Sequence, residues 1–323
     1  INSLVLKFEK KMKLAVGIDI GATITKIGLV SEDGKCIKKT SFRTKEINNF
    51  SDYIQELYNS IKSICDDLKS ICGIGIGAPN ASKNGTIETP ANLKWEGKLN
   101  LVEELKNKIN TEIHLSNDAN CAAVGEMMYG NAKDYKDFIV ITLGTGLGSG
   151  IVSNGMLVEG SDGFAAELGH YSINNMGRLT GLGVKGGLEA YVSATGIKRT
   201  IMYMLSRYMD DSVFRDISFN DLHGEDITKA AEKNDSIAIK TFEYTGKILG
   251  EALSNFVTFS QPQAIILTGG LVHSGKWIIE PTKKSFEKNL LPFYKGKVKL
   301  LTSGLEDKDS AILGSAALVW KNI

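Results

Sequence analysis

The sequence predicts an α/β protein with about two domains, and three observations carry this prediction. Short apolar runs alternate with segments of helical periodicity along the whole chain, as in proteins whose sheets are covered by helices. Several of these runs are almost entirely apolar, which indicates strands buried on both faces. The length of 323 residues, 42% of them hydrophobic and 23% charged, is sufficient for about two globular domains.

The first part of the chain predicts a hairpin, a helix and a further strand. Residues 14–20 form a buried-strand pattern, and an apolar pattern then resumes before a turn at residues 32–35. Apolar side chains recur every three or four positions across residues 53–68, as on an amphipathic helix. A strand over residues 71–76 precedes a loop-like segment, residues 80–97.

The rest of the chain continues the alternation. An apolar run over residues 138–143 meets a glycine-rich stretch, residues 144–150. The pattern of residues 226–259 is helical throughout. A buried strand is predicted over residues 264–268, and a helix rich in small residues closes the chain at residues 310–318.

Charge and cysteine usage narrow the classes of partner. The 38 basic and 37 acidic residues give a formal net charge of +1, so no strong overall field attracts nucleic acid or an anionic membrane. No apolar run approaches the ~20 residues needed to span a bilayer. The four cysteines form no CxxC pair and no ligand-like cluster, which is typical of reduced thiols. We therefore expect a cytoplasmic protein with no nucleic-acid or membrane partner.

Asp118 follows a short apolar run and precedes a helical one, so we expect it near a helix N-terminus. Ser, Asn and Asp at such a position are ordinary N-caps that accept unpaired backbone N–H groups. From the neighbouring residues alone this interpretation is favoured by about four to one, given the general preference for these residue types. The alternative is that Asp118 is a catalytic base, which depends on what the rest of the chain supplies.

Three apolar strands end abruptly in glycine, at Gly21, Gly144 and Gly269. Glycine lets backbone N–H groups turn toward an anion and lets a ligand approach the main chain, which suits the phosphates of a nucleotide. Any one of these glycines is explained by a tight turn. Three of them, each flanked by Thr or Asp, favour a nucleotide site.

The order of these features resembles the ROK family (repressors, open reading frames, kinases), within the hexokinase and actin superfamily. The segment from Asp19 to Lys26 is similar to the first phosphate loop of sugar kinases in that superfamily. The resemblance extends over nearly the whole chain from residue 13 onward. Its most specific part is the joint spacing of Asn117, Asp118, Glu167, His170 and Glu189.

The resemblance implies an α/β fold of two actin-like (ribonuclease H-like) domains with a cleft between them. The smaller N-terminal domain is expected from residues 13–117 plus 310–323, and the larger C-terminal domain from residues 118–309. Members of this family often form homodimers, so a homodimer is an expectation that the sequence itself does not test.

The implied activity is ATP-dependent phosphorylation of a hexose at its 6-hydroxyl, with ATP and Mg²⁺ as cofactors. Asp118 would be the general base that accepts the hydroxyl proton as the oxygen attacks the γ-phosphoryl group. Asp19 would hold Mg²⁺ through water. The implied contacts to nucleotide and phosphate come from Asp19, Gly21, Ala22, Thr23, Lys26, Gly144, Thr145, Gly146, Gly269 and Gly270.

A sugar presents hydroxyl groups that each donate and accept hydrogen bonds, so its site needs carboxylates, amides and imidazole at fixed positions. For the pair Glu167 and His170 taken alone, a surface helix pair at i, i+3 is the simpler interpretation, and the spacing to Glu189 argues against it. The residues that the resemblance assigns to the sugar are Asn92, Asn117, Glu167, His170 and Glu189.

The chain departs from the family at a metal site. Many ROK kinases hold zinc with a histidine that matches His170 and three cysteines of a CxCGxxGC segment. In this sequence the cysteine positions are Thr180, Leu182 and Gly187. One histidine cannot supply the four ligands of a structural zinc ion, so we predict that the protein binds no zinc.

Three functions stay open at this point. The first is a hexose kinase, with glucose as the commonest substrate in the family. The second is an N-acetylhexosamine kinase for N-acetylglucosamine or N-acetylmannosamine; the space near the sugar's second carbon would separate the two. The third is a sugar-responsive transcriptional regulator, which would carry a helix-turn-helix domain ahead of this core. Only about a dozen residues precede the first strand, which disfavours it.

Overall fold

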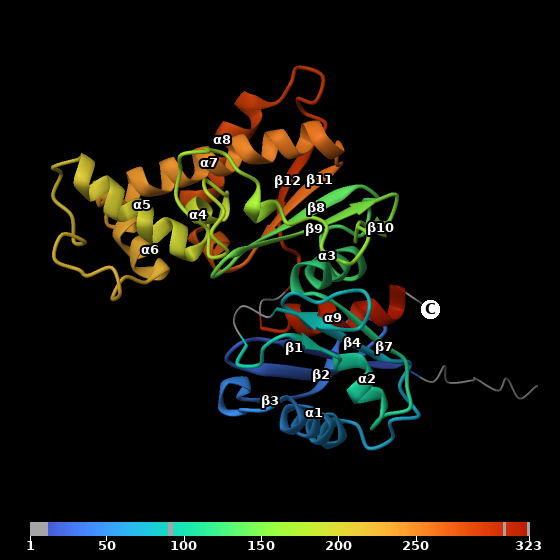
Figure 1. Ribbon diagram of the computed structural model, residues 1–323. Helices are drawn as coiled ribbons and strands as arrows, with labels where there is room; N and C mark the ends of the chain where they lie inside the picture. Colours follow the sequence, from blue (N-terminus) through green and yellow to red (C-terminus); the bar gives the residue numbers. More distant parts are fainter. Residues whose placement is uncertain (1–11, 90–92, 306–307, 322–323) are drawn as a thin grey trace, which may run out of the picture. The chain divides into compact units, whose positions relative to one another are not determined.

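The computed structural model describes residues 12–89, 93–305 and 308–321, which divide into two compact units. The first unit runs up to Asn117 and resumes at Asp309, and the second runs from Asp118 to Lys308. Asp309 therefore lies with the first unit, one residue earlier than the boundary expected from the sequence. Each unit contains a five-stranded sheet with helices on both faces (Figure 1), which confirms the predicted α/β class.

The sheet of the first unit is mixed. β1 and β2 form the predicted antiparallel hairpin, which β3 extends, while β4 and β7 continue the sheet in parallel on the other side of β1. The predicted strand over residues 71–76 begins later, at Ile74. In spatial order the strands are β3 (Cys36–Phe42), β2 (Thr25–Ser31), β1 (Leu14–Ile20), β4 (Ile74–Ala78) and β7 (Ile113–Asn117).

Helices pack on both faces of this sheet. α9 (Ser310–Lys321) approaches one face so closely that a Cβ atom added at Gly17 would lie 2.2 Å from the carbonyl oxygen of Ile312. α1 (Phe50–Ile64) covers the opposite face (Figure 1). Alternate residues of β1 therefore contact different helices. Glycine in this part of the chain serves helix packing, at Gly17, as well as turns.

Shorter elements complete the first unit. α2 (Leu101–Lys106) contacts both α1 and β7. β5 (Ile87–Glu88) and β6 (Lys98–Leu99) form a small antiparallel sheet; β5 lies inside the segment that the sequence indicated as a loop, and β6 directly follows that segment. The remaining short element is the 3₁₀ helix η1 (Thr44–Glu46), where the hydroxyl groups of Thr25 and Thr44 lie 2.8 Å apart.

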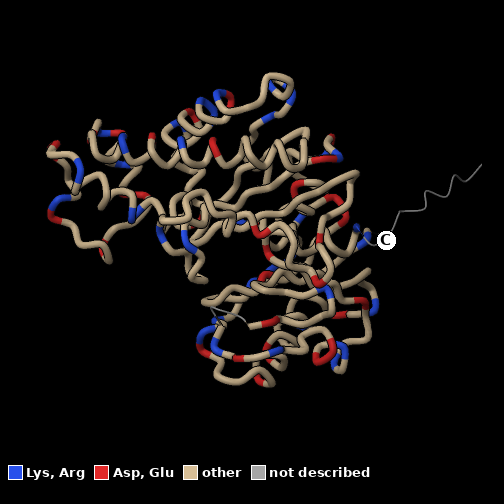
Figure 2. Tube along the Cα trace, turned by 45° about the horizontal axis from the view of Figure 1, so that its top comes forward, with Lys and Arg blue, Asp and Glu red and all other residues tan. Residues whose placement is uncertain are grey.

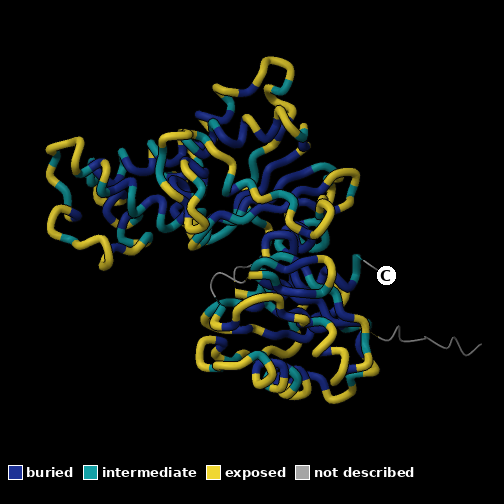
Figure 3. The backbone as a smooth tube through the Cα atoms, viewed as in Figure 1, coloured by how far each residue is buried: buried dark blue, intermediate teal, exposed yellow. Residues whose placement is uncertain are grey.

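The second unit repeats the same pattern of strand directions. β8 pairs antiparallel with β9 on one side and parallel with β11 on the other. β8 and β11 have the bounds that the sequence predicted and are almost completely buried (Figure 3). In spatial order the strands are β10 (Met156–Leu157), β9 (Leu147–Ser153), β8 (Phe138–Leu143), β11 (Ala264–Thr268) and β12 (Lys299–Thr302).

α3 (Asp118–Met128) packs on one face of this sheet because two residues of β9 have no side chain. A Cβ atom at Gly148 would lie 2.9 Å from the Cβ of Ala119, and one at Gly150 would lie 2.7 Å from the Cβ of Ala123. The glycine-rich stretch of residues 144–150 is therefore not a single loop, because β9 begins at Leu147. Gly148 and Gly150 lie in that strand and admit the helix that begins at Asp118.

The other face of the second sheet carries the remaining helices, which share one hydrophobic core with β8 and β11. One continuous helix over residues 226–259 was predicted, and this is wrong. Asn234 adopts a left-handed φ of 63° and Asp235 caps a new helix. The helices on this face are α4 (Glu189–Val192), α5 (Ala194–Arg207), α6 (Gly224–Glu232), α7 (Ser236–Ser260) and α8 (Lys276–Asn289).

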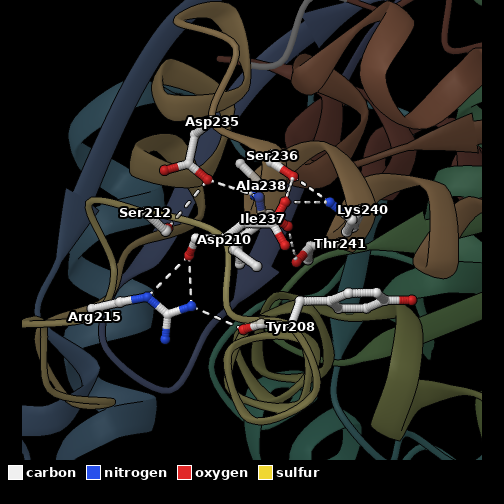
Figure 4. A network of polar contacts seen from close by, with 10 residues as sticks. All are labelled: Tyr208, Asp210, Ser212, Arg215, Asp235, Ser236, Ile237, Ala238, Lys240 and Thr241. Atoms are coloured by element: carbon white, nitrogen blue, oxygen red, sulfur yellow. Dashed lines mark hydrogen bonds and ion pairs between the residues drawn. The ribbon is translucent and has the colours of Figure 1, made fainter.

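Polar contacts fix the start of α7 to the loop that follows α5 (Figure 4). The Asp235 carboxylate accepts hydrogen bonds from the N–H groups of Ile237 and Ala238, at 2.9 and 3.0 Å, and from the Ser212 hydroxyl at 3.1 Å. Asp210 accepts hydrogen bonds from the Ser236 hydroxyl at 2.7 Å and from Lys240 at 3.0 Å, and these contacts lower the pKa of its carboxyl group. The network stabilises the second helix of the segment that the sequence pattern had merged.

Basic and acidic residues are interspersed along the chain in both units (Figure 2), and the formal net charge is +1. Within the described part of the chain, no helix is both long enough and apolar enough to cross a membrane.

Candidate functional site

Two of the predicted glycine segments meet at one edge of the second sheet. β8 and β11 are parallel with Thr142 opposite Thr268, so the residues that follow each strand emerge side by side. Gly269 has a φ of 96°, and a Cβ atom there would lie 2.7 Å from the carbonyl oxygen of Leu143. Only glycine fits this close approach of two backbones. The turn Gly144–Gly146 lies at the same edge, closed by a hydrogen bond of 3.0 Å from the Gly144 N–H to the Gly146 carbonyl.

Glu189, the first residue of α4, links this turn to the segment of residues 171–188. Its Oε2 accepts the Leu147 N–H at 2.9 Å, and its Oε1 accepts the Gly181 N–H at 3.4 Å. A Cβ atom at Gly146 would lie only 2.4 Å from Oε2, so the absence of a side chain there makes room for the carboxylate. Each carboxylate oxygen keeps a further lone pair for a ligand hydroxyl.

Asp118 begins α3, directly after Asn117, the last residue of β7. Its Oδ1 accepts the N–H of Ala119 at 2.8 Å. Although the side chain is exposed at its surface, desolvation by the surrounding protein raises the pKa of the carboxyl group, and the Ala119 N–H opposes that shift. The two interpretations of Asp118 are therefore compatible, because one carboxylate oxygen can pair with the helix start while the other stays available.

Glu167 and His170 lie at a 3₁₀ turn, Leu168–His170, in which the His170 N–H donates to the Glu167 carbonyl at 3.1 Å. Desolvation raises the pKa of Glu167, the negative charges of Asp118 and Glu189 raise it further, and His170 lowers it. Mutual electrostatic influence of this kind requires short separations. The second unit therefore gathers four of the predicted residues: Asp118, Glu167, His170 and Glu189.

The imidazole of His170 has an unpaired nitrogen. Its Nδ1 is buried and has no hydrogen-bond partner among the described residues. Leaving such a group unpaired costs about 1–3 kcal/mol, so the site favours a ligand that can donate to or accept from it.

The segment at which many ROK kinases bind zinc is filled by packing in this protein. Thr180 is 6% exposed, and a Cβ atom added at Gly187 would lie 2.4 Å from its methyl group. The Thr180 hydroxyl accepts the Val184 N–H at 3.1 Å, while Leu182 is 62% exposed. Across the part of the chain that the structure describes, no three His, Cys, Asp or Glu residues are grouped so that they could hold a metal ion. These residues do not fit zinc, and its absence stays a prediction.

The candidate residues of the first unit lie at the β1–β2 hairpin. Asp19 is opposite Lys26 in the strand register. The Gly21 N–H donates to the Ile24 carbonyl at 3.2 Å, and a Cβ atom at Gly21 would lie 2.8 Å from that oxygen. Ala22 and Thr23 form the bend between the strands. Asn92, assigned to the sugar from the sequence, lies outside the described residues.

Comparison with known proteins decides the family. The family model described as the ROK family matches residues 15–322. The chain belongs to the ROK family. Among curated ROK relatives, a glucokinase of Thermotoga maritima is 30% identical over 97% of this chain and 99% of its own length. A glucokinase of Streptomyces coelicolor is 28% identical over 87% and 89%. A xylose repressor of Bacillus subtilis is 25% identical over 98% of this chain and 79% of that protein.

Solved ROK structures share the fold. The glucokinase of Streptomyces griseus, in complex with glucose and AMPPNP, superposes with a TM-score of 0.78 at 27% identity and covers 94% of this chain and 98% of that one. The ROK hexokinase of Thermus thermophilus has a TM-score of 0.78 at 21% identity, over 96% and 98%. The predicted family is thus confirmed.

Sequence reasoning missed the backbone and positioning groups of this site. The N–H groups of Leu147 and Gly181 hold Glu189, and a backbone donor carries no side-chain signal. It also missed Arg178, which contacts α4 and α5. The one available indication was Gly146, whose missing side chain admits the Glu189 carboxylate.

Proposed function

We propose that this ROK protein is an ATP-dependent sugar kinase that phosphorylates the 6-hydroxyl of a hexose, with glucose as the leading substrate. The observation that carries the proposal is that Asp118, Glu167, His170 and Glu189 lie together in the second unit. Glu189 also joins this group to the glycine turn Gly144–Gly146, because it accepts the N–H of Leu147 directly after the turn. Glucokinases that are 28–30% identical over most of the chain support glucose, as does the solved glucokinase that contains glucose and AMPPNP.

Asp118 accepts the proton of the attacking hydroxyl in this proposal. A pKa raised above the ordinary aspartate value, chiefly by desolvation, makes its carboxylate a better proton acceptor. General-base catalysis contributes roughly 100- to 10,000-fold. The remaining rate enhancement of a phosphoryl transfer comes from aligning the reactants and stabilising negative charge.

The nucleotide contacts are assigned to the two glycine segments of the second unit, Gly144–Gly146 with Thr145, and Gly269–Gly270. Asp19, Gly21, Ala22, Thr23 and Lys26 are the candidates of the first unit for phosphate and Mg²⁺. Mg²⁺ usually takes one or two protein carboxylates and completes its shell with phosphate oxygens and water. Asp19 fits that role, and the bound ion would supply positive charge to the transferring phosphoryl group.

The sugar contacts are assigned to Glu167, His170 and Glu189, with Asn117 and Asn92 as the amides. A buried polar group that loses its partner costs about 1–3 kcal/mol, so an epimer with a misplaced hydroxyl binds correspondingly less well. We also propose that the protein is cytoplasmic, forms a homodimer and binds no zinc.

The deciding experiment is a coupled assay of ADP release with glucose, mannose, fructose, N-acetylglucosamine and N-acetylmannosamine. We expect sugar-dependent ADP release, fastest with glucose, and a kcat lower by roughly 100- to 10,000-fold in Asp118→Asn. If no sugar stimulates ADP release by the native chain, the kinase proposal is wrong. Near-native activity of Asp118→Asn would instead show that Asp118 is not the base. Faster ADP release with an N-acetylated sugar than with glucose would make that sugar the substrate.

A further inference from the structure

The segment of residues 171–188 keeps a defined shape by contacts within itself. Its ends pair through hydrogen bonds from Leu188 N–H to the Tyr171 carbonyl, at 3.0 Å, and from Ile173 N–H to the Gly186 carbonyl, at 2.9 Å. In its middle, the Gly186 N–H donates to the Arg178 carbonyl at 2.7 Å. Arg178 therefore lies at the centre of the segment whose Gly181 N–H donates to Glu189.

The side chain of Arg178 attaches this segment to the helices behind it. Its guanidinium group donates to the Thr200 hydroxyl at 2.8 Å and to the Gly196 carbonyl at 3.3 Å. The same group lies over the ring of Tyr191, 4.7 Å from its centroid, and the Tyr191 hydroxyl accepts the Arg178 backbone N–H at 3.1 Å. Thr200 and Tyr191 are buried, at 0% and 5% exposure, so these contacts are shielded from water.

These contacts lie on both sides of Glu189. Arg178 precedes Gly181, whose N–H donates to Glu189, by three residues, and Tyr191 follows Glu189 by two residues in α4. Gly177 allows the arrangement, because a Cβ atom there would lie 2.2 Å from the Tyr191 hydroxyl oxygen. Movement of Arg178 would therefore release the Gly181 N–H and the start of α4 together.

We propose that Arg178 is a positioning residue that orients Glu189 toward the sugar and does so without a metal ion. The inference rests on the proposed sugar-kinase function. In this proposal the guanidinium group of Arg178, held by Tyr191 and Thr200, fixes the segment of residues 171–188. Thr180 and Gly187 leave that segment without thiolate ligands for zinc.

The chain offers a matched control. Arg207 lies on α5, the helix that contains Thr200, and its guanidinium is 6.0 Å from the ring centroid of Tyr203, to whose hydroxyl it donates at 3.0 Å. It is exposed and makes no hydrogen bond or ion pair with residues 171–188. Arg207→Met removes the same group from an arginine–tyrosine pair in which the arginine is not hydrogen-bonded to the segment.

The test compares Arg178→Met, Thr200→Val and Arg207→Met by steady-state kinetics and by hydrogen exchange of residues 177–187. In Arg178→Met we expect the KM for glucose to rise roughly 10- to 100-fold, the effect of moving a binding group by about 1 Å, with the KM for ATP nearly unchanged. Amide exchange in the segment accelerates. Thr200→Val shows the same effects to a smaller degree, and Arg178→Lys restores part of the glucose affinity because it keeps the cation over Tyr191.

Several outcomes overturn the inference. One is an unchanged KM for glucose in Arg178→Met; another is an equal rise in the KM for ATP, which indicates general disruption. Exchange in residues 177–187 that is the same in Arg178→Met and Arg207→Met also rejects the clamp, and that comparison holds even if no sugar is a substrate. Finding one zinc per native chain rejects the metal-free arrangement. If Arg178→Met fails to fold, Thr200→Val decides by the same criteria.

Discussion

Gly146→Ala tests the placement of Glu189 with a single methyl group. The added Cβ would lie 2.4 Å from Oε2 of Glu189 and 3.2 Å from its carboxyl carbon. Ordinary contacts of a Cβ atom begin near 3.4 Å, so the carboxylate must move by about 1 Å. The backbone at Gly146 does not have a positive φ, and alanine therefore introduces no backbone strain there.

The size of the expected loss in activity depends on which atoms can move to relieve the clash. The clashing atom is the end of a flexible side chain, so the carboxylate rotates away at little cost to folding and gives up its 2.9 Å bond to the Leu147 N–H. A displacement of about 1 Å in a binding group costs roughly 100-fold, or about 2.7 kcal/mol, in kcat/KM. We expect that loss in kcat/KM for the sugar, with a melting temperature close to that of the native protein.

The assay is sugar-dependent ADP release, with thermal unfolding measured on the same samples. Gly144→Ala adds the same methyl group to the same turn, where nothing lies within 4 Å of the new atom. Gly144 and Gly146 are both assigned to phosphate, so both substitutions are expected to change the KM for ATP. Only Gly146→Ala displaces the Glu189 carboxylate, so only that substitution is expected to change the KM for the sugar. A Gly146→Ala enzyme with native kcat/KM for the sugar would refute the assigned role of Glu189.

Three further results are expected. Asp235→Ala removes the N-cap of α7 and should lower the free energy of unfolding by about 1–2 kcal/mol, which urea denaturation measures; an unchanged midpoint contradicts it. Since the pKa values of Asp118 and Glu167 are raised, kcat/KM for the sugar should fall on acidification at a higher pH than ordinary carboxylates would give, and a flat profile down to their ordinary range rejects this. The same shift means that ionised Asp118 costs stability above the unfolded pKa. Asp118→Asn should therefore be at least as stable as the native chain at pH 7, with no advantage below the ordinary aspartate pKa.

The strands that the sequence predicted correctly are those buried on both faces. β1, β8 and β11 are largely apolar and each is followed directly by glycine, so composition and turn residues agree on their bounds. β4 was placed too early because Ile71 is buried although it lies outside the strand. Burial and strand pairing are separate properties, and an apolar pattern reports only the first.

Helix boundaries depended on backbone details that periodicity does not encode. The apolar spacing continues from α6 into α7, yet the left-handed Asn234 and the capping Asp235 separate the helices. α8 escaped prediction because it contains Pro281 and many charged residues. Close packing against α7 compensates, since a Cβ atom at Gly246 would lie 2.8 Å from the Pro281 ring.

The side chains proposed for the site came from the family's spacing, but the way they are held could not. The sequence shows that the three thiolate ligands are missing, and from this alone only the absence of zinc can be predicted. The structure adds that the volume beside Gly187 is occupied by the Thr180 methyl group and that Arg178 reaches the buried Thr200. A cysteine at position 187 would collide with that methyl group, so restoring one ligand alone would disrupt the packing without creating a zinc site. Zinc binding would require Thr180, Leu182 and Gly187 to change together, because His170 with fewer than three thiolates does not complete a four-ligand site.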